Sequence, residues 1–309
     1  MISYSIVIST YNQKYTLKLA LESLSRQIKT PKIFELIIAD DASTDGIDEF
    51  IKKLRFPIFL KYIRSDENLG RSKNRNRGIE KAMGKQVILF DGDMVPEDGF
   101  IEAYMRAWDE FPSGVILGSW RAPDNTNNSR WQKYQLSRGR LGMSRGQNVP
   151  GKYFTSGNFS IANNILSKMS GFDTSFEGWG GEDTDFGFRL ERNGVPMHFM
   201  PEASCLHYHN KAISETISEY ERYGKYGYRA LMNKYPETVM FEKGWLLGLP
   251  DSTKGVYRKI ISIILYPLRL SPSLWILRKL AAINDGALFS DSLFDWLLYG
   301  HLARGFRRR

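Results

Sequence analysis

A chain of 309 residues exceeds the usual size of one hydrophobic core, so we expect one large domain with additions, or two domains. The hydrophobic fraction of 42% and charged fraction of 25% exclude a disordered protein, and the single cysteine, Cys205, excludes an intrachain disulfide and a cysteine-based zinc site. The net charge of +9 is concentrated near the C-terminal end, which excludes a nucleic-acid-binding core.

The first part of the chain alternates short apolar runs with helical patterns. Strands are predicted at residues 5–9, 34–39, 58–63 and 87–90, and helices after Tyr15, at 48–54 and at 71–83. This alternation predicts an α/β fold with a mainly parallel sheet and helices on both faces. Ligands bind such sheets at the carboxyl ends of the strands, so residues 1–95 are expected to form a ligand-binding half.

Beyond residue 96 the pattern is looser. A helix at 100–108 and a strand at 115–118 precede a polar stretch, 122–149, which we expect to be a loop covering a site. A strand at 153–162 and a helix ending near Arg189 follow. We expect residues 96–215 to complete the same domain and residues 216–309 to form a helical extension.

The extension is basic and amphipathic. Within residues 250–309, ten Lys or Arg against four Asp or Glu give a net charge of +6. Val256, Ile260 and Ile264 recur at helical spacing beside Arg258 and Lys259, a pattern typical of helices that lie on an anionic membrane. We therefore predict a cytoplasmic protein that can lie on the inner face of the cell membrane. Packing of these helices on the rest of the chain, or on a second copy in a homo-oligomer, is the alternative.

Acidic residues follow two of the predicted strands. Two carboxylates in Asp91-Gly92-Asp93 can hold Mg²⁺ or Mn²⁺, which in turn bridges a diphosphate, and Gly92 would let a ligand approach closely. Asp40-Asp41 can accept hydrogen bonds from a base or a ribose, with helix capping as the alternative. Asn68-Leu69-Gly70 precedes a helix start rich in basic residues, including Arg75, which suits phosphate unless it is only a solvated face.

A second group of motifs lies further along the chain. In residues 178–183, glycines flank Trp179 and would leave its face open for a pyranose ring, and Glu182 and Asp183 can position and deprotonate a hydroxyl group. A core Trp followed by two helix-capping carboxylates is the alternative. His207 and His209 follow a strand-like run, and only one of them can easily face a metal site.

These motifs together resemble the GT-A glycosyltransferases of family 2. The family order is matched by residues 5–12, by Asp40 to Asp45, by Asn68-Leu69-Gly70 with Arg75-Asn76, and by Asp91-Gly92-Asp93. The second half, from Ser156-Gly157-Asn158 to Asp185, resembles the carboxyl-terminal part of β-1,4-galactosyltransferases and the N-acetylgalactosaminyltransferase domain of bacterial chondroitin polymerases. The resemblance covers about residues 3–210.

The resemblance implies a nucleotide-sugar site in the first half of the domain. It places uracil and ribose at Thr10, Asp40 and Asp41, and the pyrophosphate near Arg75. Asp91 matches the ribose-side carboxylate of the family.

It also implies a metal site and an acceptor site. Asp93 matches the metal ligand and His207 the metal-binding histidine, with His209 as second choice. Asp183 matches the catalytic base, and Glu182 lies beside it at the acceptor.

The expected activity follows from these roles. We expect an inverting glycosyltransferase, dependent on Mn²⁺ or Mg²⁺, that transfers a hexose or N-acetylhexosamine from a UDP-sugar to a hydroxyl of a glycan or lipid-linked glycan. Bacterial surface polysaccharide synthesis is the expected setting, and Trp179 is expected to contact the acceptor. An inactive sugar-nucleotide or glycan-binding module is the main alternative; a nucleotidyltransferase and a retaining transferase are further ones. Ala42 stands where the family usually has Gly, at little cost if its φ is negative.

Overall fold

The computed structural model describes residues 2–123, 129–138, 142–176, 178–208, 211–236 and 271–308. The chain forms two compact units. Unit 1 comprises Met1–Thr126, Gly139–Ser175 and Glu182–His209; unit 2 comprises Asn127–Arg138, Phe176–Gly181 and Asn210–Arg309. Both expected halves, 1–95 and 96–215, therefore contribute to unit 1, whereas the expected extension, 216–309, belongs to unit 2. His209 and the amphipathic pattern at 256–264 lie outside the described residues.

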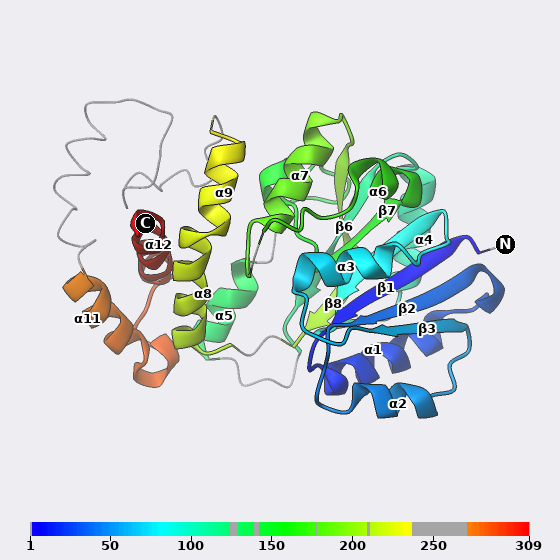
Figure 1. Cartoon of the computed structure of the whole chain (residues 1–309), viewed down its shortest axis with the longest axis horizontal. Helices are drawn as coiled ribbons and strands as arrows, with labels where there is room; N and C mark the ends of the chain where they lie inside the picture. Colours follow the sequence, from blue (N-terminus) through cyan, green and yellow to red (C-terminus); the bar gives the residue numbers. More distant parts are fainter. Residues whose placement is uncertain are drawn as a thin grey trace. The chain divides into compact units, whose positions relative to one another are not determined.

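In the described part of unit 1, a single sheet of eight strands has the order β3-β2-β1-β4-β7-β6-β8-β5 (Figure 1). The pairs among β1 to β4 are parallel, and β6 pairs parallel with β8, while β7 and β5 add antiparallel pairs. The strands are β1 (Tyr4–Thr10), β2 (Phe34–Asp40), β3 (Phe59–Arg64), β4 (Gln86–Asp91), β5 (Met94–Pro96), β6 (Val115–Arg121), β7 (Asn158–Ala162) and β8 (Met197–His207). The predicted α/β fold is confirmed.

Helices cover both faces of this sheet because successive strand residues point to opposite sides. Ile6 and Ile8 of β1 pack in the core under α1, α2 and α4, whereas Val7 packs in the core under α6 and α7. Figure 1 shows α1 and α2 on one side of the sheet and α3 on the other. The helices are α1 (Lys14–Gln27), α2 (Ile47–Lys53), α3 (Arg71–Ile79), α4 (Phe100–Glu110), α6 (Asn163–Met169) and α7 (Glu182–Arg192), with 3-10 turns η1 (Pro31–Ile33) and η2 (Gly151–Tyr153).

Two boundaries differ from the sequence expectation. Helix α3 ends at Ile79, short of the predicted residue 83, because the chain must then turn through Gly84, where an added Cβ would lie 2.5 Å from the Ser5 amide nitrogen. The strand expected at 153–162 starts only at Asn158, after η2.

The backbone at Ala42 does not meet the condition under which Ala would replace Gly at little cost. Its φ is 64°, in the left-handed region rather than negative. An L-residue other than Gly pays about 1–2 kcal/mol there. The turn is nevertheless held, because the next residue, Ser43, donates from both its amide and its hydroxyl to Asp40.

Unit 2 is helical and has its own core. Trp131 and Tyr134 pack with Ile217, Phe294 and Leu297, among others. Its described helices are α5 (Arg130–Arg138), α8 (Ile213–Lys225), α9 (Gly227–Lys234), α11 (Ser271–Ala281) and α12 (Asp291–Arg307), with a 3-10 turn, η5 (Ile283–Gly286). The predicted helical extension is confirmed for its described residues. The polar stretch 122–149, expected to be a loop, contains α5, which is fixed by its two buried aromatic residues.

Candidate active site

The side chain of Arg75, from α3, is nearly fully buried and faces the end of β4. Its Nη2 donates hydrogen bonds to both carboxylate oxygens of Asp91, at 2.9 and 3.0 Å. Its Nη1 lies 3.4 Å from Oε1 of Glu182 and 3.8 Å from Oδ1 of Asp183. One guanidinium therefore joins three carboxylates that come from β4 and from the first turn of α7.

The charge of Arg75 is firmly held by these neighbours. Burial opposes the charged form, but the carboxylates of Asp91, Asp183 and Glu182 outweigh it and raise the pKa of Arg75. Because its donors are engaged by carboxylates, its expected contact with a pyrophosphate stays a prediction. Burial also raises the pKa of Asp91, and Arg75 partly offsets this effect.

Glu182 and Asp183 differ in environment although they are adjacent. The side chain of Glu182 is only 4% exposed, whereas that of Asp183 is 31% exposed. Burial, and then the charge of Asp183, raise the pKa of Glu182. Oδ2 of Asp183 accepts a hydrogen bond from the Ser156 amide at 3.2 Å. Of the two, Asp183 is therefore the more exposed carboxylate, and its part as the catalytic base stays a prediction.

Asp93 and His207 are brought together by the pairing of β5 with β8. Met94 lies opposite His207 in this antiparallel pair, and the amide of Tyr208 donates to the carbonyl oxygen of Asp93 at 2.9 Å. Nε2 of His207 then lies 3.5 Å from Oδ2 of Asp93. The family resemblance predicted that Asp93 and His207 share one site, but the sequence did not show the pairing of β5 with β8 that brings them together.

These two side chains fit a divalent cation. Donor atoms about 2.1 Å from one ion lie roughly 3–4 Å apart, which matches the separation of Nε2 and Oδ2. Among the described residues, no group of three or more His, Cys, Asp and Glu could hold a metal ion. An ion here would thus depend on few protein ligands, as Mg²⁺ and Mn²⁺ do when water and phosphate oxygens complete their shell.

Gly92, between the two aspartates, is required by the protein itself. A Cβ at this position would lie 2.6 Å from Oγ1 of Thr10 and 2.6 Å from Oε1 of Gln13. The absence of a side chain at residue 92 therefore allows close packing against Thr10 and Gln13, and not the approach of a ligand. Substitution of Gly92 would push Asp91 and Asp93 away from their positions.

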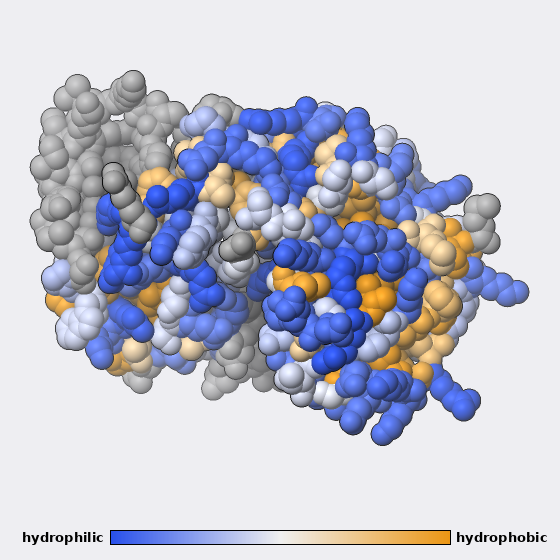
Figure 2. All heavy atoms as spheres, in the orientation of Figure 1, coloured by the Kyte–Doolittle hydropathy of each residue, from blue (hydrophilic) through white to orange (hydrophobic). Residues whose placement is uncertain are grey.

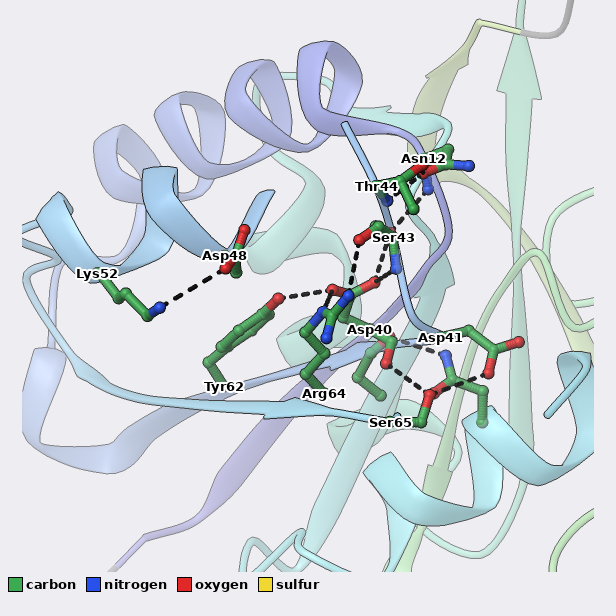
Figure 3. Close-up of polar contacts among 12 residues, drawn as sticks. Asn12, Asp40, Asp41, Ser43, Thr44, Asp48, Lys52, Tyr62, Arg64 and Ser65 are labelled. Carbon is green, nitrogen blue, oxygen red and sulfur yellow. Dashed lines mark hydrogen bonds and ion pairs between the residues drawn. The ribbon is translucent and has the colours of Figure 1, made fainter. Parts of the chain in front are cut away.

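Asp40, at the end of β2, is completely buried within a polar network (Figure 3). Oδ1 accepts from the Ser43 hydroxyl at 2.5 Å, and Oδ2 accepts from the Tyr62 hydroxyl at 2.6 Å, with Arg64 Nε at 3.6 Å. Burial and the hydrogen bond to Asp40 raise the pKa of Tyr62. The carboxylate of Asp40 is thus already hydrogen-bonded within the protein.

Asp41 ties two loops together. Its carboxylate accepts hydrogen bonds from the amides of Leu69 and Gly70, at 2.7 and 2.9 Å, just before α3. Its own amide donates to the carbonyl oxygen of Thr10 at 3.0 Å. Thr10, Asp40 and Asp41 are all buried, so they form the framework around the strand ends, and their direct contact with a nucleoside stays a prediction. The sequence showed the strand ends but not this framework.

Trp179 belongs to unit 2 and is half-buried there. Its ring lies 5.3 Å from that of Tyr220 and 5.8 Å from that of Tyr223, between centroids. Gly180 has a φ of 91°, and an added Cβ would lie 2.8 Å from the Tyr223 ring. Gly180 therefore serves aromatic packing in this unit, and acceptor contact by Trp179 stays a prediction.

One cavity in unit 1 lies away from these residues. It has a volume of about 940 Å³ and is lined by Gly84, Lys85, Gln86 and Asn163, among others. These residues surround the start of β4, whereas Asp91 and Asp93 lie at and just beyond its end. The cavity is therefore not part of the acidic cluster.

Comparison with known proteins identifies the class. Residues 5–172, more than half of the chain, match the family described as glycosyl transferase family 2. The chain belongs to this family and is a glycosyltransferase. Residues 143–211 also match the family described as the N-terminal domain of galactosyltransferase.

Several curated relatives are similar over part of their length. Chondroitin synthase of Escherichia coli is 28% identical over 66% of this chain and 34% of its own length. Hyaluronan synthase of Pasteurella multocida is 28% identical over 62% of this chain and 23% of its own. Validoxylamine A glucosyltransferase of Streptomyces hygroscopicus subsp. limoneus is 28% identical over 62% of this chain and 49% of its own. The chain spans about a quarter to a half of these relatives.

Solved structures show the same fold. The mannosyltransferase PcManGT from Pyrobaculum calidifontis, in complex with GDP-Man and Mn²⁺, gives a TM-score of 0.65 at 14% identity, over 99% of this chain and 88% of that one. S. aureus TarS 1–349 in complex with UDP-GlcNAc gives a TM-score of 0.56 at 16% identity, over 96% of this chain and 90% of that one. The fold is therefore that of the GT-A glycosyltransferases.

Proposed function

We propose that the protein is an inverting glycosyltransferase that moves a hexose or N-acetylhexosamine from a UDP-sugar to a hydroxyl of a glycan or lipid-linked glycan. Bacterial surface polysaccharide synthesis, on the cytoplasmic side, is the proposed setting. The observation that carries the proposal is the guanidinium of Arg75, which holds Asp91 together with Glu182 and Asp183 beside the Asp93–His207 pair. Support for the donor class comes from TarS, solved with UDP-GlcNAc, and PcManGT, solved with GDP-Man.

The residues of unit 1 have distinct parts in the proposed reaction. Asp183 accepts the proton of the acceptor hydroxyl while that oxygen bonds to the anomeric carbon and the bond from this carbon to the diphosphate breaks. The Ser156 amide and Arg75 hold the Asp183 carboxylate in place. Arg75 also fixes Asp91 at the end of β4, beside the position proposed for the ribose.

Asp93 and His207 would hold the Mn²⁺ or Mg²⁺ ion. A bound divalent cation supplies positive charge that stabilises a leaving diphosphate. The carboxylate and imidazole suit such an ion, and PcManGT was solved with Mn²⁺.

The activity is tested by incubating the full chain with UDP- and GDP-sugars, Mn²⁺ and candidate glycan acceptors, with release of the nucleoside diphosphate as readout. Acceptor-dependent release of UDP, with inversion at the transferred anomeric carbon, is expected. Tight nucleotide binding without release over the whole panel would indicate the alternative, an inactive binding module. Release of GDP only would show that the donor is a GDP-sugar and not a UDP-sugar.

Asp93→Ala is expected to abolish the metal dependence of nucleotide binding, because it removes the hard oxygen ligand of the proposed ion. The measurement is calorimetric titration of UDP with and without Mn²⁺. Asp98→Ala is the matched control, since Asp98 is exposed and lies five positions further along the chain. If Asp93→Ala and the unmodified protein gave equal titrations in both conditions, the proposed metal site would be wrong.

A further inference from the structure

Helix α11 of unit 2 has one buried face and one exposed face. Leu274 and Ala281 are completely buried, and Leu277 packs against the core of the unit. The opposite side also carries large apolar side chains: Trp275 is 60% exposed and Ile276 51%. An ordinary surface helix would place polar residues on this second face.

The exposed apolar residues of α11 share one side of the helix. At about 100° per residue, Trp275, Ile276 and Leu280 span roughly 140° of its circumference, and Lys279 projects between Trp275 and Ile276. Leu280 is 48% exposed, and Ile283, in the following turn η5, is 54% exposed. We call Trp275, Ile276, Leu280 and Ile283 the α11 face. Figure 2 shows apolar atoms among hydrophilic ones where Figure 1 draws α11.

Two cations accompany the α11 face: Lys279 lies within it, and Arg278 lies at the edge nearest to Leu274. Arg278 and Lys279 are both exposed, and Nζ of Lys279 lies 5.7 Å from the centre of the Trp275 ring. The sequence of α11 contains no acidic residue, and Asp285 in η5 is the first one after it. Long basic side chains beside an exposed Trp and aliphatic residues match the layering of a bilayer surface, where apolar groups insert shallowly and cations remain among anionic headgroups.

We propose that the α11 face docks on an anionic lipid surface, with Arg278 and Lys279 among the headgroups. No described helix is long and apolar enough to cross a bilayer. A second copy of the chain is a poorer occupant, because self-pairing of this face would bring Arg278 and Lys279 towards their own copies. The proposal does not depend on the proposed donor or acceptor.

The test is co-sedimentation of the full chain with vesicles. The protein is expected to bind phosphatidylcholine vesicles that contain about one third phosphatidylglycerol, and to bind pure phosphatidylcholine more weakly. The double variant Arg278→Glu with Lys279→Glu should lower the partition coefficient of the protein on anionic vesicles at least about 25-fold. Each basic residue at an anionic surface contributes about fivefold to this coefficient. Ile276→Ser with Leu280→Ser should also reduce binding, in this case to both kinds of vesicle.

Phe59→Ser is the matched control, because Phe59 is a similarly exposed apolar residue, in β3 of unit 1. It should bind vesicles like the unmodified protein. Trp275 gives an independent readout: brominated lipids should quench the fluorescence of the protein, and Trp275→Phe should remove most of that quenching. All variants change exposed residues, and their thermal melting is expected to match that of the unmodified protein.

The proposal is overturned if the unmodified protein fails to bind anionic vesicles, or if the α11 variants bind them equally well. It is also overturned if these variants change only the molar mass of the protein in solution, since the face would then be a protein interface. Activity on a soluble acceptor should be unaffected by the variants. A failure of membrane binding is therefore distinguishable from a failure of the proposed reaction.

Discussion

Asp183→Asn is expected to lower turnover by about 10²–10⁴-fold, the usual contribution of a general base. The amide oxygen of Asn can still accept the hydrogen bond from the Ser156 amide, so the local fold should persist. Because Asp183 is not placed at the nucleotide, the affinity for UDP should stay close to that of the unmodified protein. Single-turnover kinetics and calorimetric titration of UDP measure the two quantities separately.

Glu182→Gln is the informative comparison for this variant. Glu182 is buried against Arg75, and Gln keeps its size and a side-chain oxygen that can accept a hydrogen bond from Arg75. Its loss of turnover should be much smaller than that of Asp183→Asn. Normal turnover by Asp183→Asn, or a larger loss in Glu182→Gln, would assign the base to a residue other than Asp183.

Arg75→Met is expected to damage both stability and activity. It leaves Asp91, Glu182 and Asp183 close together without the buried cation that holds them. Removing one partner of a buried ion pair costs about 3–5 kcal/mol, and the lower end applies here because Asp91 and Asp183 are partly solvated. Turnover should fall as well, since the end of β4 and the start of α7 lose their common contact.

The two effects are measured by urea denaturation and by turnover of the folded variant. The stability and turnover of Arg75→Lys should lie between those of Arg75→Met and of the unmodified protein. One ammonium group cannot form the planar, forked hydrogen bonds by which a guanidinium joins several carboxylates. Lys73→Met is the control, since Lys73 is an exposed cation in the same helix. An Arg75→Met protein as stable as Lys73→Met would show that the carboxylate cluster does not need the guanidinium.

The parallel part of the sheet was predictable because buried parallel strands are short, continuous apolar runs. Residues 5–9, 34–39 and 87–90 lie within β1, β2 and β4. The acidic pairs stand where these runs end, so their shared edge followed from the parallel topology. The β5–β8 pairing could not be predicted in this way, because β5 has only three residues and its partner lies more than a hundred positions away.

The partners of buried charges were also beyond sequence reasoning. Basic residues at the start of α3 suggested phosphate, but Arg75 meets Glu182, 107 positions away, once α7 packs on the sheet. Helix α5 was missed because polar residues dominate it. Only the spacing of Trp131 and Tyr134, three positions apart, indicated a buried helical face, and their burial depends on α12 in unit 2.

The hydrogen bonds of Asp41 have a consequence for the motions of unit 1. The amides of Leu69 and Gly70 lie in a loop, where exchange with deuterated solvent is normally fast, yet both donate to a buried carboxylate. They can exchange only when the turn after β2 releases them. Protection at these two amides should therefore approach that of β2 itself, and the loop that leads into α3 should open together with the end of that strand.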